Sequence, residues 1–210
     1  MLRLFSLVFF VISSFSVYGN VIEEVKRISD NHDRISLVLF INQIKKGRIS
    51  QEEFAFLEAV WAGRPNGFVD LPSELFDDVE IRVELAHFLA QSHLNNHHST
   101  NLDVLHDFLR DNVNSNNIMV RIKSTVSLGL FDYETDIPLL LQIALKEDPV
   151  TFKSSIHSIF SMCNTKVDAA IEQLKNQLKK HTNKQYLEMK VEKRQKDIFV
   201  QSGCWANIKR

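Results

Sequence analysis

The sequence has little glycine, proline and cysteine: its 210 residues include 6 glycines, 4 prolines and 2 cysteines. A phosphate-binding loop needs closely spaced glycines, and the glycines here are scattered, so that class of nucleotide site is excluded. No carboxylate pair and no Ser/His/Asp arrangement stands out as catalytic. We therefore expect no catalytic residues, no bound metal and no cofactor.

The rest of the composition is average for a soluble protein. Apolar residues make up 44% and charged residues 24%, enough for a continuous core with an ordinary surface. The length fits one domain or a short array of stacked hairpins. Acidic residues outnumber basic ones over 20–111, whereas basic residues are in excess over 112–210. A surface with two signs of charge can steer an oppositely charged partner, although solvated helix faces would give the same counts.

The first 19 residues differ in composition from the rest. Met1-Leu2-Arg3 is a short basic segment, residues 4–15 are almost wholly apolar, and Ser16-Val17-Tyr18-Gly19 places small residues before a cleavage point. This pattern predicts a secretory signal peptide, residues 1–19, cleaved after Gly19. The alternative is an uncleaved membrane anchor, but the apolar stretch is shorter than the about 20 residues that a spanning helix needs. We expect a periplasmic or secreted protein without stable membrane insertion.

Both cysteines lie in the second half of the chain, at Cys163 and Cys204. Export to an oxidising compartment favours one disulfide between them. A redox-active pair normally has the spacing Cys-x-x-Cys, so the pair predicts a structural bond that ties the C-terminal tail to the preceding helices.

We expect residues 20–72 to form a set of N-terminal helices. The spacing of apolar residues favours helices over about 20–29 and 33–46. Ser50 followed by Glu53 forms a capping box, which predicts that a third helix begins there. The residues expected on its buried face are Phe54, Leu57, Val60 and Trp61.

Residues 181–210 are expected to form a C-terminal cap. Between 184 and 200, apolar and charged residues alternate as in a strand, but the same residues are good helix formers. We favour a final helix over a hairpin because a lone two-stranded sheet would need a surface to pack on.

Residues 73–180 contain a recurring pattern. Its three copies run from Ile81-Arg82 to Ala90, from Val120-Arg121 to Gly129, and from Phe152-Lys153 to Ser161. Each is followed by a second apolar stretch of helical period; in the middle copy, Asp136 with Pro138 marks where that second helix begins. The first two copies begin 39 residues apart and the last two 32 residues apart, and a longer polar loop around residues 95–100 accounts for the difference. A period of this size is typical of stacked helix pairs. A non-repetitive helical bundle is the alternative.

These three copies resemble HEAT-like repeats of the short, phycobilisome-lyase type, in which a Val-Arg pair precedes a small residue and then Leu-Gly. The third copy departs from the pattern at Phe152-Lys153 and at Ser161. The resemblance implies an all-α fold: an α-α superhelix of HEAT-like helical hairpins whose second helices line a concave surface. It implies no activity. Some HEAT-like proteins are di-iron hydroxylases that use paired His-Glu dipeptides, and this chain contains none.

Without a catalytic pattern, binding to another protein is the function we expect. The partner class would be a toxin, as for immunity proteins, or an envelope protein. Residues that the packing motif leaves free would make the contact, and the expected partner-binding residues are Arg110, Gln142, Lys146, Lys175 and Lys179. Nucleic acid is not expected, because the basic residues after 175 are interleaved with a single tyrosine.

The alternative function is a metal-dependent enzyme that uses the region from His93 to His106. His93 and His97 are four residues apart, a spacing that can place two zinc ligands on one helix face, and His98 is adjacent. Asn95 and Asn96 weaken the helix at that point, which favours solvated loop histidines instead.

Overall fold

A computed structural model describes residues 21–44, 49–63, 71–93, 101–146, 148–163, 166–178 and 183–196. Over these ranges the chain forms helices and no strand, so the prediction of an all-α fold is confirmed for them. The predicted signal peptide, Lys179 and Cys204 lie outside the described residues. The helices are α2 (Val21–Asp30), α3 (Arg34–Ile44), α4 (Gln51–Trp61), α5 (Ser73–Phe76), α6 (Val79–His93), α7 (Leu102–Asn112), α8 (Ile118–Leu128), the 3-10 turn η1 (Glu134–Asp136), α9 (Ile137–Ala144), α10 (Pro149–Ser161), α11 (Lys166–Gln177) and α12 (Lys184–Lys196).

The chain divides into two compact units, residues 1–89 and 90–210. In the first, α2 packs against α3 and α4. The predicted capping box is present at the start of α4: the Ser50 side chain accepts from the Glu53 N–H, and the Glu53 side chain accepts from the Ser50 N–H. Glu53 also accepts from the Val21 N–H at 2.9 Å, so the capping residue joins α2 to α4. The predicted buried face of α4 is confirmed, with Phe56 in addition.

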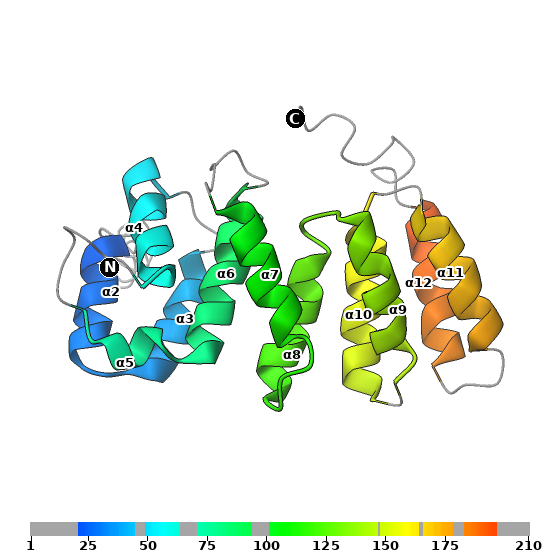
Figure 1. The fold of residues 1–210 in the computed structure, drawn as a ribbon, viewed down its shortest axis with the longest axis horizontal. Helices are drawn as coiled ribbons and strands as arrows, with labels where there is room; N and C mark the ends of the chain where they lie inside the picture. Colours follow the sequence, from blue (N-terminus) through cyan, green and yellow to red (C-terminus); the bar gives the residue numbers. More distant parts are fainter. Residues whose placement is uncertain are drawn as a thin grey trace, which may run out of the picture. The chain divides into compact units, whose positions relative to one another are not determined.

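In the second unit, successive helices pack together in pairs: α7 against α8, α9 against α10, and α11 against α12 (Figure 1). Across these pairs, α8 packs against α10, α10 against α12, and α9 against α11. The segment from 184 to 196 is helical, as favoured from sequence, and Leu187 of α12 is completely buried.

Equivalent positions of the recurring pattern are buried alike. Ile81, Val120 and Phe152, which open the three copies, all have 0% exposed surface. Near the end of the copies the match changes, because Leu128 is fully buried but Phe160 is only half-buried and Ile159 is buried in its place. The recurring pattern therefore corresponds to the buried face of each first helix, except that the buried position near the end of α10 is shifted by one residue.

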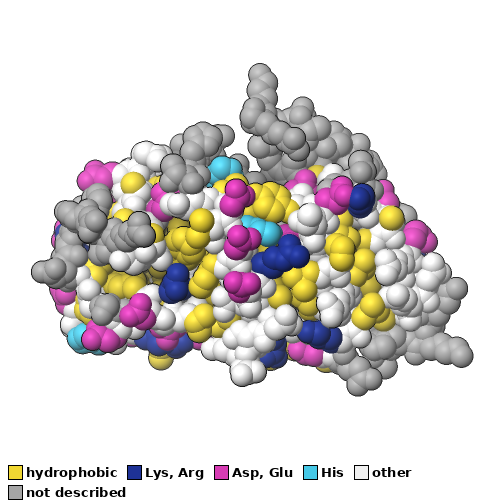
Figure 2. Space-filling model, in the orientation of Figure 1, with side chains coloured by type: hydrophobic (Ala, Val, Ile, Leu, Met, Phe, Trp, Pro, Cys, Tyr) yellow, Lys and Arg dark blue, Asp and Glu magenta, His cyan; other side chains and the backbone are white. Residues whose placement is uncertain are grey.

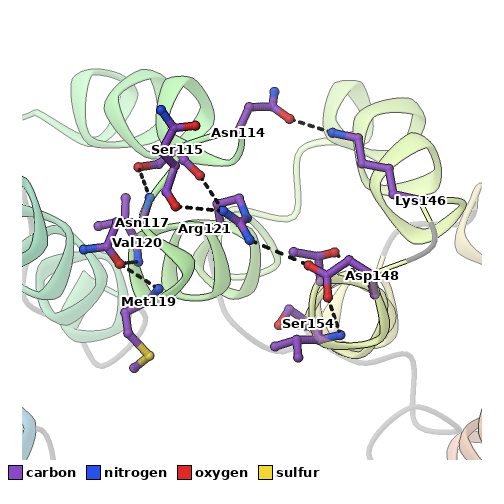
Figure 3. A network of polar contacts seen from close by, with 12 residues as sticks. Asn114, Ser115, Asn117, Met119, Val120, Arg121, Lys146, Asp148 and Ser154 are labelled. Atoms are coloured by element: carbon purple, nitrogen blue, oxygen red, sulfur yellow. Dashed lines mark hydrogen bonds and ion pairs between the residues drawn. The ribbon is translucent and has the colours of Figure 1, made fainter.

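Arg121, the arginine of the best-matching copy, fastens one interhelical turn to the next. Its Nη1 donates to the carbonyl oxygens of Ser115 and Asn116 at 2.8 and 3.1 Å, and its Nη2 lies 3.8 Å from Asp148 Oδ2 (Figure 3). Lys146 makes a parallel link, donating to Asn114 Oδ1 at 2.8 Å. The α7–α8 and α9–α10 turns are thus held side by side by polar contacts.

Gly129, at the end of α8, sits directly against α10. A Cβ added there would lie 2.7 Å from the Ser158 carbonyl oxygen and 2.8 Å from the Ser158 Oγ, and would also collide with the Ser161 hydroxyl. Both helices carry small buried residues, and small side chains leave room for close helix packing. These residues are Ser124, Thr125, Ser127, Ser154, Ser155 and Ser158.

No helix among the described ranges is long and apolar enough to cross a bilayer.

Gly129→Ala is expected to destabilise the fold by about 1–3 kcal/mol, the usual cost of forcing extra volume into a packed interior. Part of the collision is with backbone, so a side-chain rotation cannot relieve it. Urea denaturation followed by circular dichroism measures the effect, with Gln142→Ala on the exposed face of α9 as the control. An unchanged midpoint for Gly129→Ala would contradict the close contact of α8 with α10.

Candidate functional site

A buried polar cluster joins α7 to the start of α9. The carboxylate of Asp136 is 0% exposed, and its Oδ2 lies 2.7 Å from Nε2 of His106 on α7. Its Oδ1 accepts a hydrogen bond from Arg110 Nη1 at 2.9 Å. Both carboxylate oxygens are therefore engaged, which is the condition for keeping such a group away from water.

Asp136 has a different role from the one its sequence context indicates. It does precede α9 with Pro138 in the first turn, as predicted, but its side chain makes no capping hydrogen bond to that helix. The carboxylate turns instead to the preceding helix α7. Its position was predictable, whereas its contacts with residues 26 and 30 positions upstream were not.

Two aromatic rings enclose His106. The His106 ring meets Phe131 edge-on, with the ring centroids 5.1 Å apart. The ring of Tyr133 is tilted against the His106 ring, at a centroid distance of 4.6 Å. The Tyr133 hydroxyl donates to Asp103 Oδ1 at 2.8 Å. Burial, together with the nearby carboxylate of Asp103, raises the pKa of Tyr133 to about 12, so the phenol stays protonated and remains a donor.

The charge of His106 depends on two opposing effects. Burial of the ring lowers the pKa of His106, but the hydrogen bond and charge of Asp136, helped by Asp107 at 3.3 Å from Nδ1, outweigh that effect. The pKa of His106 therefore lies above its ordinary value. The protonated ring can donate from both nitrogens, to Asp136 and to Asp107.

This arrangement is suited to holding helices together and orienting surface groups. Both nitrogens of His106 are occupied by carboxylates, so neither is free to take a substrate proton or to bind a metal in this state. The hydroxyl of Tyr133, whose ring lies beside His106, is bound to Asp103 and resists ionisation. Arg110 is different, because its side chain remains 40% exposed while one end of its guanidinium is fixed on Asp136.

The outer face of α7 is acidic. Asp103, Asp107 and Asp111 are exposed and follow one another at intervals of four residues, which places them on one side of the helix. Figure 2 shows acidic side chains in a row over α7, with histidine and basic side chains beside them. Arg110 thus lies next to a line of opposite charge.

The expected partner-binding residues occupy different surroundings. Arg110 belongs to the buried cluster, Gln142 is exposed on α9, and Lys146 is exposed but bonded to Asn114. Lys175 pairs with Glu172 on its own helix at 2.6 Å. Asp136 and Tyr133 were missed from the sequence, because no local pattern connects either residue with α7.

Only part of the region from His93 to His106 lies within the described residues. His93 ends α6 and His106 is buried in the cluster, while His97 and His98 fall outside the described residues. In the part of the chain that the structure describes, no three or more His, Cys, Asp or Glu side chains are grouped as metal ligands.

Comparisons of this chain with protein-family models, with curated proteins and with solved structures find no match.

The His106–Asp136 contact predicts a pH dependence of stability. Because the pKa of His106 is raised on folding, its contribution is fully present below the ordinary value of 6.5 and is lost as the pH rises through the folded-state pKa. The free energy of unfolding should therefore fall over the range above pH 6.5, and His106→Gln should flatten that fall. Urea titrations across this range measure both slopes.

A second variant, Asp136→Asn, tests the buried ion pairs of the same cluster. It leaves Arg110 and His106 without their buried counter-charge, and should cost about 3 kcal/mol, near the lower end for breaking a buried pair because Arg110 is partly solvated. Asp111→Asn, an exposed change on α7, the helix that carries His106 and Arg110, is the control.

Equal pH slopes in the natural chain and His106→Gln would show that His106 is not the titrating group.

Proposed function

We propose that this chain is an exported protein-binding module, built as a short α-α superhelix of HEAT-like hairpins and without a catalytic role. Two packing features support the repeat interpretation: the equal burial of Val120 and Phe152, and the contact of α8 with α10 at Gly129. Stacked hairpins of this kind present long continuous surfaces, and repeat arrays commonly use such surfaces for binding.

The observation that carries the binding proposal is the state of Arg110. Its guanidinium is fixed by the buried carboxylate of Asp136, yet much of the side chain faces solvent. Tyr133 is likewise held in place, by His106 and Asp103, and is only partly buried. Arginine and tyrosine dominate the energetic centres of protein interfaces. Because both side chains are already held in place, less conformational entropy is lost when a partner binds.

Arg110 also keeps hydrogen-bonding capacity for a partner. The planar guanidinium has five N–H donors, and its bond to Asp136 uses one of them. The remaining donors form a fork suited to a carboxylate or to backbone carbonyls. Gln142 on α9, and Lys146, Lys175 and Lys179 beyond it, would extend the contact along the array.

Export belongs to the same proposal. Residues 1–19 would be removed after Gly19, and the mature chain would act in the periplasm or outside the cell. A bond between Cys163 and Cys204 would be stable there, and closing the loop between them would contribute about 4 kcal/mol in the chain-entropy model. A toxin or an envelope protein is the partner class that fits a small exported binding module.

Site-specific photo-crosslinking tests the binding surface. A photoreactive amino acid in place of Gln142, in the full chain produced in its own cells, should give one discrete crosslinked product. Arg110→Lys in the same protein should reduce that product, because lysine keeps the charge beside Asp136 but lacks the fork; we expect about tenfold weaker binding, or about 1.4 kcal/mol.

The matched control places the photoreactive group at Gln51, which is exposed on α4 in the first unit. The proposal fails if no product forms from position 142, or if position 51 gives the same product. It also fails if Arg110→Lys leaves the yield unchanged.

Thiol titration tests export and the disulfide together. Protein recovered after export and denatured without reductant should show no reactive thiol, and its N-terminus should be Asn20. The same chain made without residues 1–19 in a reducing cytoplasm should show reactive Cys163 and Cys204. Free thiols in the exported protein would rule out the bond.

A further inference from the structure

A second surface, formed by α10 and α12, carries positive charge around one tyrosine. The Tyr186 ring of α12 lies against Phe152 of α10 with a centroid distance of 5.9 Å. Lys153 of α10 and Lys190 of α12 place their ammonium groups 5.7 and 5.4 Å from the centroid of the same ring. Tyr186 therefore brings together two lysines that are far apart in sequence.

Helical spacing extends this group on both helices. Tyr186, Lys190 and Lys193 stand at i, i+4 and i+7 on α12, and Lys153 and His157 at i and i+4 on α10, so each set shares a face. Leu187 is fully buried and fixes which side of α12 packs inward. We call Lys153, His157, Tyr186, Lys190 and Lys193 the lysine cluster.

The lysines of this cluster differ from several other lysines in their charged neighbours. Within the described ranges, no carboxylate forms an ion pair with Lys153, Lys190 or Lys193. In contrast, Lys26 pairs with Glu23 at 3.2 Å, and Lys184 pairs with Glu188 at 3.5 Å on another face of α12. Like charges gathered without compensation repel one another, and an anionic partner would relieve that repulsion.

The pKa of His157 is affected by the positive charge around it. Partial desolvation of the ring, followed by the charges of Lys190 and Lys193, lowers the pKa of His157 from its ordinary value. Lys153 stands one turn earlier on the same helix, so it adds a third positive charge to the same face. At neutral pH the imidazole is therefore uncharged and can donate or accept a hydrogen bond.

We propose that the lysine cluster is a docking surface for an acidic segment of a protein partner. This inference rests on the proposed function, since it names the chemistry of the segment that a protein-binding module would recognise. Carboxylates two residues apart on an extended chain are about 7 Å apart, close to the about 5–6 Å between neighbouring positions on a helix face. Such a segment can therefore reach several of the lysines at once.

Two other anionic partners fit this surface less well. A membrane-surface helix needs a row of apolar side chains to insert, whereas Met189 is the one large exposed hydrophobic residue on the described part of α12. A single-stranded nucleic acid needs open aromatic faces for stacking, but lysines from both helices lie near the ring of Tyr186.

The test measures binding of a fluorescein-labelled oligoglutamate peptide to the full mature chain by fluorescence anisotropy. The variant Lys153→Gln/Lys190→Gln/Lys193→Gln should bind at least about tenfold more weakly, because three lysine–carboxylate contacts are lost together. Binding by the natural chain should weaken as salt is raised.

A matched control removes three positive charges that already have partners. Lys26→Gln/Arg27→Gln/Lys184→Gln carries the same net charge as the cluster variant, and each of the replaced side chains forms an ion pair within its own helix. It should bind the peptide within about twofold of the natural chain. An equal loss in both variants would mean a response to net charge alone, and would overturn the proposal.

A second measurement reports the site directly. The pKa of His157, followed by NMR, should rise when the peptide is added, because carboxylates offset the charges of Lys190 and Lys193. No change in that pKa at saturating peptide would place binding elsewhere. The NMR spectra of the cluster variant also establish that it is folded.

The remaining outcomes separate this inference from the proposed function. Tighter, cluster-dependent binding to phosphatidylglycerol vesicles or to DNA than to the peptide would replace the acidic segment with that other partner class. If the peptide fails to bind but crosslinking from Gln142 succeeds, only the inference about the lysine cluster is wrong. If the peptide binds at the cluster and crosslinking from Gln142 fails, the face around Arg110 is the part that is wrong.

Discussion

The close approach of α8 to α10 at Gly129 is the contact on which the arrangement of the second unit depends. Gly129, at the end of α8, lies against Ser158 of α10 with no room for a further carbon atom, and both helices carry other small buried residues. Close backbone approach leaves little room for extra atoms, because protein interiors are packed as densely as organic crystals. This contact sets the spacing of successive hairpins, and the turns linked by Arg121 and Lys146 reinforce it at one end.

The cluster around Asp136 adds a polar constraint to this apolar packing. A buried carboxylate is tolerated only with partners, and here Arg110 and His106 supply one for each oxygen. Because those partners come from α7, the start of α9 cannot move relative to α7 without breaking a charged hydrogen bond. The same constraint fixes Arg110 and Tyr133 at the surface, so one interaction serves both stability and the presentation of binding groups.

Charge is distributed unevenly over the helices of the second unit. The exposed face of α7 carries Asp103, Asp107 and Asp111, whereas α10 and α12 gather lysines around Tyr186. A protein with this pattern can select partners by complementarity, since an acidic segment is attracted to one face and repelled by the other. The excess of basic residues after 112 indicated this tendency, but composition could not say that Lys153 lies beside α12.

The sequence by itself determined the helices, their boundaries near Ser50 and Asp136, and the buried positions at Ile81, Val120 and Phe152. These are local properties, set by the helical period and by capping groups within a few residues. Only the tertiary structure decided that Asp136 would bind α7 instead of capping α9, and that Tyr186 would be flanked by lysines from two helices. Contacts between residues some 30 positions apart depend on how helices are placed against one another, and no spacing rule along the chain encodes that placement.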